Sequence, residues 1–228
     1  MVLDIINKEK DHYKKFLVTS EYDELYKWEA LKNFEENWNI EALDFKQMYD
    51  NSFKSKYSDN LWAGGHWFPK SVMLQFIDHD QERVRIMFRA LYNEEEGVDK
   101  RVERFVFHCD KILEEIFETD KSMKNHFHDG QRIVSTYLAF RFPEKYAIYK
   151  FKQFKTFMKV VRATDIPRTG EYERFFRVVR TLNNILSKDE ELMRLHRIIL
   201  TDECYKKDTL MLAQDFIFRT AQRYLPKK

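Results

Sequence analysis

The sequence has few of the residues that form tight turns, with five glycines and four prolines among 228 residues. β-Sandwiches, β-barrels and glycine-rich nucleotide-binding sheets usually have many more, so the composition disfavours these folds. Only two cysteines occur, Cys109 and Cys204, which does not suit a disulfide scaffold. No apolar run approaches the roughly 20 residues of a membrane span, and the N-terminus lacks a signal peptide's apolar stretch. We therefore expect a cytoplasmic protein without a membrane partner.

The chain also lacks the short motifs of common enzyme classes. It has no Gly-x-x-x-x-Gly-Lys-Ser/Thr phosphate loop, no Gly-x-Gly-x-x-Gly, no Gly-x-Ser-x-Gly and no Cys-x-x-Cys. His126 and His128 come nearest to a metal-binding pair, but the sequence suggests no third or fourth ligand, which favours a solvated loop. We therefore expect no metal, no cofactor and no catalytic residue in this chain.

Apolar residues are abundant and recur at helical spacing. Hydrophobic residues make up 43% of the chain and aromatic residues 16%, which is enough for a core. The pattern is clearest from Val98 to Phe117. The expected helices span residues 2–17, 21–38, 41–56, 70–78, 80–93, 98–117, 130–142, 151–163, 171–187, 189–200 and 208–224. The residues expected in the core include Trp28, Phe34, Trp38, Phe105, Ile112, Ile116, Leu182 and Leu186.

These patterns predict an all-α protein, a globular bundle of about ten helices in one domain over residues 1–228. Tyr146–Tyr149 is expected to be extended and to form at most a short strand pair. The segment 60–69, which contains Gly64 and Gly65, is expected to be a loop. Residues 120–129 suit either a long loop or a sub-boundary between domains.

Positive charge is concentrated in one part of the chain. The net charge is only +2, yet residues 145–180 carry +7 and the remaining residues −5. This distribution favours a polyanion contact on one face, with plain solvation of helices as the alternative. On the helices expected at 151–163 and 171–187, the cations lie opposite the apolar stripe and could form one basic ridge. The candidate DNA-backbone contacts are Lys150, Lys152, Lys155, Lys159, Arg162, Arg168, Arg174, Arg177 and Arg180.

Aromatic residues gather around the glycine pair of the expected loop. The candidates for contact with a nucleic-acid base are Trp62, His66, Trp67 and Phe68. Aromatic rings on a loop can stack on an unstacked base. The alternative is that they plug the side of a helical core.

Arg101 and His108 form one enzymatic pattern. Six residues separate them within the most amphipathic segment. The spacing is similar to that of α-helical ribonucleases of the HEPN class, in which Arg steadies a phosphate while His acts as acid or base. Val102 departs from that family's pattern, which usually has a polar residue there. The structural alternative is a solvated Arg101 and a His108 beside the apolar face.

Longer stretches resemble a family of restriction proteins. These are Tyr26–Trp38, Trp67–Met73, Ser135–Phe151 and Leu210–Ile217. They resemble the N-terminal region of bacterial McrB-like AAA+ proteins, the motor subunits of modification-dependent restriction systems in anti-phage defence. The resemblance implies a domain that selects DNA, often with modified cytosine. It also implies partners in the intact system, namely a C-terminal AAA+ core that hydrolyses GTP or ATP and a nuclease subunit.

The sequence thus favours a non-enzymatic DNA-recognition domain whose AAA+ motor core is absent from this chain. The first alternative is an α-helical protein-interaction module of an AAA+ system. The second is a HEPN-like ribonuclease.

Overall fold

The computed structural model describes residues 1–19, 21–62, 68–122 and 130–226, and helices are the only regular secondary structure within them. The all-α prediction is therefore confirmed. The twelve helices are α1 (Leu3–Leu17), α2 (Tyr26–Asn37), α3 (Phe45–Ser52), α4 (Ser55–Trp62), α5 (Pro69–His79), α6 (Gln81–Tyr92), α7 (Val98–Thr119), α8 (Gly130–Arg141), α9 (Phe151–Val160), α10 (Tyr172–Leu186), α11 (Glu190–Ile199) and α12 (Met211–Tyr224).

Capping residues explain where several helices begin. Asp44, Asp80 and Asp189 each accept a hydrogen bond from the backbone N–H three residues further on, at the starts of α3, α6 and α11. This bond satisfies one of the N–H groups that the first turn leaves without a backbone partner. Pro69 stands in the first turn of α5, where its missing N–H costs nothing.

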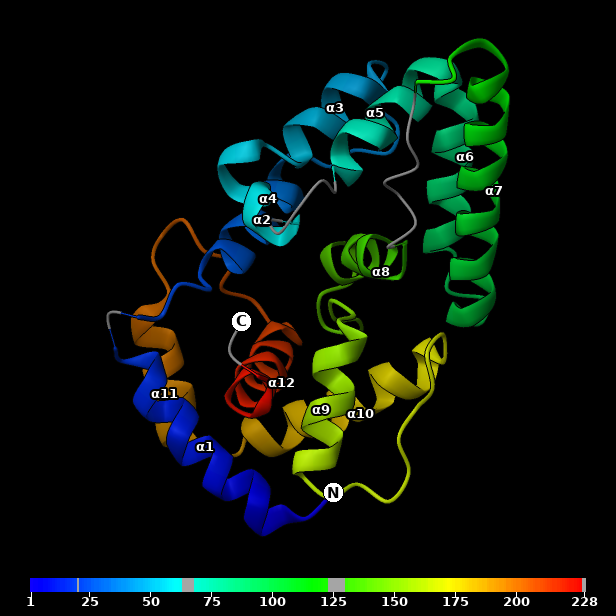
Figure 1. Ribbon diagram of the computed structural model, residues 1–228. Coiled ribbons are helices and arrows are strands. Elements are labelled where there is room, and N and C mark those ends of the chain that lie inside the picture. The colour runs from blue at the N-terminus through cyan, green and yellow to red at the C-terminus, as the bar shows by residue number, and fades with distance from the viewer. Residues whose placement is uncertain (20, 63–67, 123–129, 227–228) are drawn as a thin grey trace.

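Helix α8 lies between two groups of helices (Figure 1). The group above it contains α2–α7, and the group below it contains α1 and α9–α12. Helix α8 contacts α2, α6 and α7, while α12 contacts α1, α9 and α10. Every residue from Ile133 to Phe140 is buried, so this part of α8 has no solvent-facing side, as expected for a helix enclosed by others.

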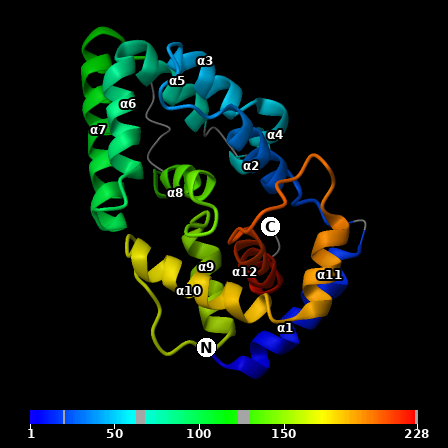
Figure 2. The same cartoon turned by 180° about the vertical axis from the view of Figure 1, so that it is seen from behind.

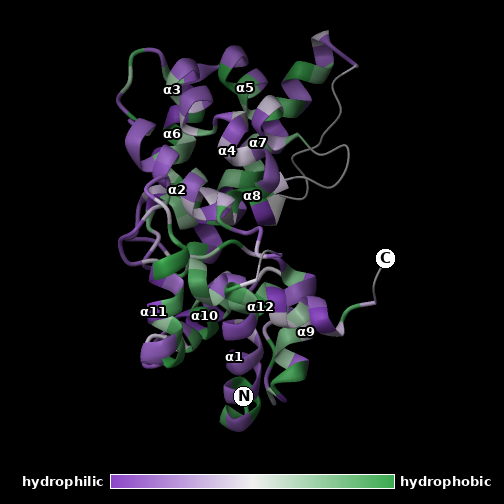
Figure 3. Cartoon of the chain, turned by 90° about the vertical axis from the view of Figure 1, so that its left-hand side faces the viewer, coloured by the Kyte–Doolittle hydropathy of each residue, from purple (hydrophilic) through white to green (hydrophobic). Residues whose placement is uncertain are grey.

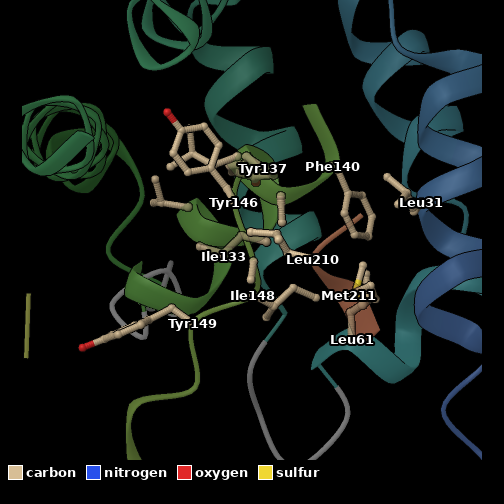
Figure 4. Close-up of a cluster of buried hydrophobic side chains, with 14 of the residues drawn as sticks. Leu31, Leu61, Ile133, Tyr137, Phe140, Tyr146, Ile148, Tyr149, Leu210 and Met211 are labelled. Atoms are coloured by element: carbon tan, nitrogen blue, oxygen red, sulfur yellow. The ribbon is translucent and has the colours of Figure 1, made fainter. Parts of the chain in front are cut away.

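The two groups share one core. Figure 4 shows side chains from α2, α4 and α8 meeting those of the segment before α9 and of the start of α12. The buried apolar residues of the described chain form one continuous cluster. The candidate sub-boundary at 120–129 falls mostly on residues 123–129, which lie outside the described part of the chain.

Most helices are amphipathic, and hydrophilic and hydrophobic colours alternate along them in Figure 3. The predicted core is largely confirmed. The buried members are Trp28, Phe34, Phe105, Ile112, Leu182 and Leu186. Trp38 and Ile116 are partly buried and pack against the same cluster. The apolar spacing therefore identified the inner faces of α2, α7 and α10.

The expected single helix over 41–56 is wrong, because the chain forms α3 and α4 there, separated at Phe53 and Lys54. The side-chain amide of Asn33 donates to the carbonyl oxygens of Asn51 and Ser52, at 2.9 and 2.8 Å. These bonds satisfy carbonyl groups that the last turn of α3 leaves without helical partners. Helix α4 then extends to residue 62, so the start of the expected loop at 60–69 is helical.

The segment from Tyr146 to Tyr149 is neither helix nor strand, so the expected strand pair does not form within the described residues. All four of its side chains are buried. The backbone N–H of Tyr149 donates to Ser135 Oγ on α8 at 2.8 Å. A serine hydroxyl therefore takes the place that a neighbouring strand would have in a sheet.

Candidate nucleic-acid interface

The basic segment includes α9, the loop after it and α10. The buried side of α9 consists of Phe154, Phe157 and Met158. Lys152, Lys155 and Lys159 are exposed on the opposite side of α9, and Arg162 is exposed just after Val161. We call these four cations the α9 basic face. Because one side of the helix packs against the core, these four cations remain in solvent together.

The α9 basic face has no carboxylate partner in the described part of the chain. Within the described residues, no ion pair involves any of its four side chains. Elsewhere in the basic segment, Lys145 pairs with Glu94, with 2.5 Å between Nζ and Oε2. Unpaired cations gathered on one face produce a positive potential that attracts anions from solution.

The cations of α10 behave differently from those of α9. Arg174 lies 2.6 Å from Asp165 and 2.5 Å from Glu171, and Arg180 lies 2.7 Å from Glu173. Arg168 and Arg177 are exposed and form no ion pair with a described residue. Of the four arginines expected to contact DNA from α10 and the loop before it, only Arg168 and Arg177 are thus available to an external anion.

The inner faces of α9 and α10 meet each other. The rings of Phe154 and Phe175 are 4.8 Å apart and nearly perpendicular. Helix α9 lies in front of α10 in Figure 1 and behind it in Figure 2. Arg177 is exposed on α10 and the four cations of the α9 basic face belong to α9 and the residue after Val161, so we treat α9 alone as the candidate interface.

Lys150 does not belong to the α9 basic face. It is partly buried, and its Nζ lies 4.2 Å from the centre of the Phe218 ring on α12. Its side chain thus extends toward the core side of α9. The sequence analysis grouped it with the exposed cations because it lies within the basic segment 145–180.

The aromatic candidates divide into three cases. Trp62 is 7% exposed, ends α4 and lies 5.9 Å from the ring of Phe53, so its assignment as a base contact is wrong. His66 and Trp67 lie outside the described residues. Phe68 precedes α5 and is 57% exposed, which leaves its ring accessible.

The pair Arg101 and His108 does not form a phosphate site. Arg101 is buried, contrary to the expectation of a solvated side chain. Its Nη1 donates to Leu91 O at 2.8 Å and its Nη2 to Tyr146 Oη at 2.6 Å. Burial and the nearby Arg83 and Arg104 lower the pKa of His108. Arg101 thus joins α7 to its neighbours, and its guanidinium is unavailable to a substrate.

Several further expectations concern metals, cysteines and membranes. His126 and His128 lie outside the described residues. The part of the chain that is described contains no group of three side chains suited to a metal ion. Cys109 and Cys204 are both buried and unpaired with each other. Among the described helices, none combines the length and the apolar character needed to cross a bilayer.

The sequence alone did not reveal a buried ionic cluster. Lys27 on α2 is 1% exposed and forms ion pairs with Glu24 and with Asp215 on α12. A lysine in an amphipathic helix normally lies on the solvated side, so the sequence around Lys27 did not predict its burial. Asp215 is a sequence signal for such a cluster, because it is the only charged residue in the apolar run from Leu210 to Ile217.

Comparisons with known proteins yield no relative. No protein-family model matches the chain, and no curated protein or solved structure matches it either.

Proposed function

We propose that this chain is a DNA-recognition domain of a McrB-like restriction motor and holds the DNA backbone through the α9 basic face. The observation that carries the proposal is the set of four exposed cations, Lys152, Lys155 and Lys159 on one side of α9 and Arg162 just after it, without a carboxylate partner among the described residues. Such contacts fix the position of a duplex but do not themselves read its sequence. The motor and the nuclease would be supplied by other parts of the system.

The spacing of the α9 basic face suits a run of phosphates. Lys152 and Lys159 are seven residues apart, which corresponds to about 10 Å along a helix. One strand of B-DNA presents a phosphate about every 3.4 Å along the duplex axis, so this length covers about three phosphates. Lysine binds phosphate as a flexible point charge and needs no fixed orientation.

Base recognition is assigned to a different element. Of the aromatic candidates within the described residues, only Phe68 is exposed. Its ring would stack on an unpaired base such as a modified cytosine, as aromatic side chains do in single-strand binding sites. Recognition of a modified base and gripping of the backbone thus belong to separate parts of the chain.

The proposal is tested by reversing charge on α9. The triple variant Lys152→Glu, Lys155→Glu, Lys159→Glu leaves the buried side of the helix intact, so the fold is expected to survive. Its affinity for duplex DNA should fall at least tenfold at low salt, and by a similar factor for unrelated sequences. Fluorescence anisotropy with several labelled duplexes measures both effects.

A matched control shows whether binding depends on the position of the reversed lysines or only on the total change in net charge. Lys54, Lys121 and Lys188 are exposed, belong to other parts of the molecule and form no ion pair with a described residue. Reversal of these three lysines changes the net charge equally and should weaken binding far less. Equal losses in both triple variants would show that only the total charge matters.

Unchanged binding by a folded α9 variant would favour the protein-interaction module instead. That alternative has its own feature, because Ile86 on α6 and Phe107 on α7 are 59% and 56% exposed. In that case, we expect the protein to bind an AAA+ subunit. This binding should be lost when Ile86 and Phe107 are replaced by polar residues.

A further inference from the structure

A cavity of about 370 Å³ lies where the ends of α2, α6 and α8 meet. Its lining residues are Trp38 and the two residues after it, Arg89, Tyr92 and Asn93 at the end of α6, and Arg141, the last residue of α8. This volume is in the range of small-molecule sites. No lining residue belongs to α9, so the cavity is separate from the α9 basic face.

One part of the lining is apolar. The rings of Trp38 and Tyr92 are 5.9 Å apart and nearly perpendicular, and Ile40 lies beside them in the lining. Rings in this arrangement form a corner in which a further aromatic ring can pack by its face or its edge. The lining therefore suits a ligand with a planar apolar body.

The polar part of the lining offers hydrogen-bond donors. Asn39 Oδ1 accepts from the backbone N–H of Glu41 at 3.0 Å, and Asn93 Oδ1 accepts from that of Glu95 at 3.1 Å. The side-chain NH₂ groups of the two asparagines have no partner among the described residues and remain donors. No described carboxylate lines the cavity. A lining of this kind favours an anion over a cation.

Two arginines supply the positive charge. Arg141 is exposed and forms no ion pair with a described residue. Arg89 uses Nη2 to pair with Glu41 at 2.5 Å, but Glu41 does not line the cavity. Its Nε and Nη1 have no hydrogen-bond partner in the described part of the chain. The uncompensated charge of the cavity thus rests on Arg141, and Arg89 adds free donors.

The hydroxyl group of Tyr92 provides an independent sign of a missing partner. It is buried and forms no hydrogen bond with a described residue. A buried hydroxyl without a partner is costly, and most such groups in proteins are satisfied. An oxygen atom of a bound anion would give this group an acceptor.

We propose that this cavity binds a small organic anion, an aromatic ring that carries a carboxylate or a phosphate group. The guanidinium groups of Arg141 and Arg89 would hold the acid group, which they match in geometry, and the rings of Trp38 and Tyr92 would pack against the ring of the ligand. The site does not depend on DNA binding by the α9 basic face.

The test compares three ligands that share one ring system. These are 2-naphthoate, 2-naphthyl phosphate and the uncharged 2-naphthamide, each titrated into the whole chain by isothermal calorimetry at neutral pH. At least one of the two acids should bind about tenfold more tightly than the amide, because hydrogen bonds to a charged group are the stronger ones. The tighter of the two acids identifies the acid group of the ligand.

Three variants assign the binding to the cavity. Arg141→Gln should weaken acid binding by about tenfold, whereas Arg194→Gln, at an exposed and unpaired arginine on α11, should behave like the parent. Tyr92→Phe keeps the ring and removes the hydroxyl, so acid binding should fall by about fivefold. Its melting temperature without ligand should be unchanged or higher, because the hydroxyl has no partner in the free protein. A purely structural role of Tyr92 would lower that temperature.

Three results would overturn the proposal. They are no binding of either acid by the parent, equal binding of the amide and the tighter acid, and unchanged acid binding by folded Arg141→Gln. The α9 triple variant retains every lining residue, so it should bind the acid like the parent even if its DNA binding is lost. Failure of the cavity site and failure of the DNA-binding proposal are therefore seen in separate titrations.

Discussion

His196 illustrates how position in the core changes the chemistry of one residue. It is 6% exposed, and its ring lies 5.2 Å from that of Trp28. Burial lowers the pKa of His196 to about 4, and Asp215 opposes this change only in part. An unfolded histidine has a pKa of about 6.5, so between these two values the unfolded chain binds a proton that the folded protein does not. Protonation therefore favours unfolding as the pH falls.

We predict a measurable loss of stability from this residue in acid. Between about pH 7 and pH 4, His196 should account for about 3 kcal/mol of the decrease in the free energy of unfolding. The stabilising effect is fully present above about pH 6.5 and is lost as the pH approaches 4. Urea titrations of the parent and of His196→Phe at both pH values isolate this contribution, because the carboxylates are common to both. An equal decrease in the two proteins would contradict the assignment.

At the scale of the element, α7 shows what helical spacing can and cannot predict. The apolar stripe from Val98 onward gave the right helix and the right buried face, because both depend on residues three and four positions apart. The division between α3 and α4 depends instead on Asn33, about twenty residues earlier in the chain. Trp62 was misassigned for the same reason, since only the fold shows that α4 extends to this residue.

Two isoleucines on adjacent helices offer a matched test of the buried face. Ile112 on α7 is fully buried, whereas Ile86 on α6 is 59% exposed. Replacement of Ile112 by Ala should cost about 2–5 kcal/mol of unfolding free energy, through lost burial and a residual cavity. The same change at Ile86 should stay within about 0.5 kcal/mol. Urea unfolding measures both, and similar costs at the two positions would mean that the faces of these helices are assigned wrongly.

At the scale of the whole molecule, contacts between distant segments decide which charges are available. The α9 basic face was predictable because its lysines and its apolar residues alternate within one helix. The compensation of Lys27 was not, because Asp215 stands 188 residues away in sequence. The separation of Lys150 from its exposed neighbours likewise depends on Phe218, which α12 brings against α9.

The central claim is that the α9 basic face grips the backbone of duplex DNA, and the salt dependence of binding tests it most directly. Each phosphate contact contributes about 0.9 to the negative slope of log affinity against log salt. If Lys152, Lys155 and Lys159 each contact one phosphate, their exchange for Glu should reduce the magnitude of the slope by about 2.7 between about 50 and 200 mM salt. The triple change at Lys54, Lys121 and Lys188 should leave the slope nearly unchanged. A folded α9 variant with the slope of the parent would contradict the account.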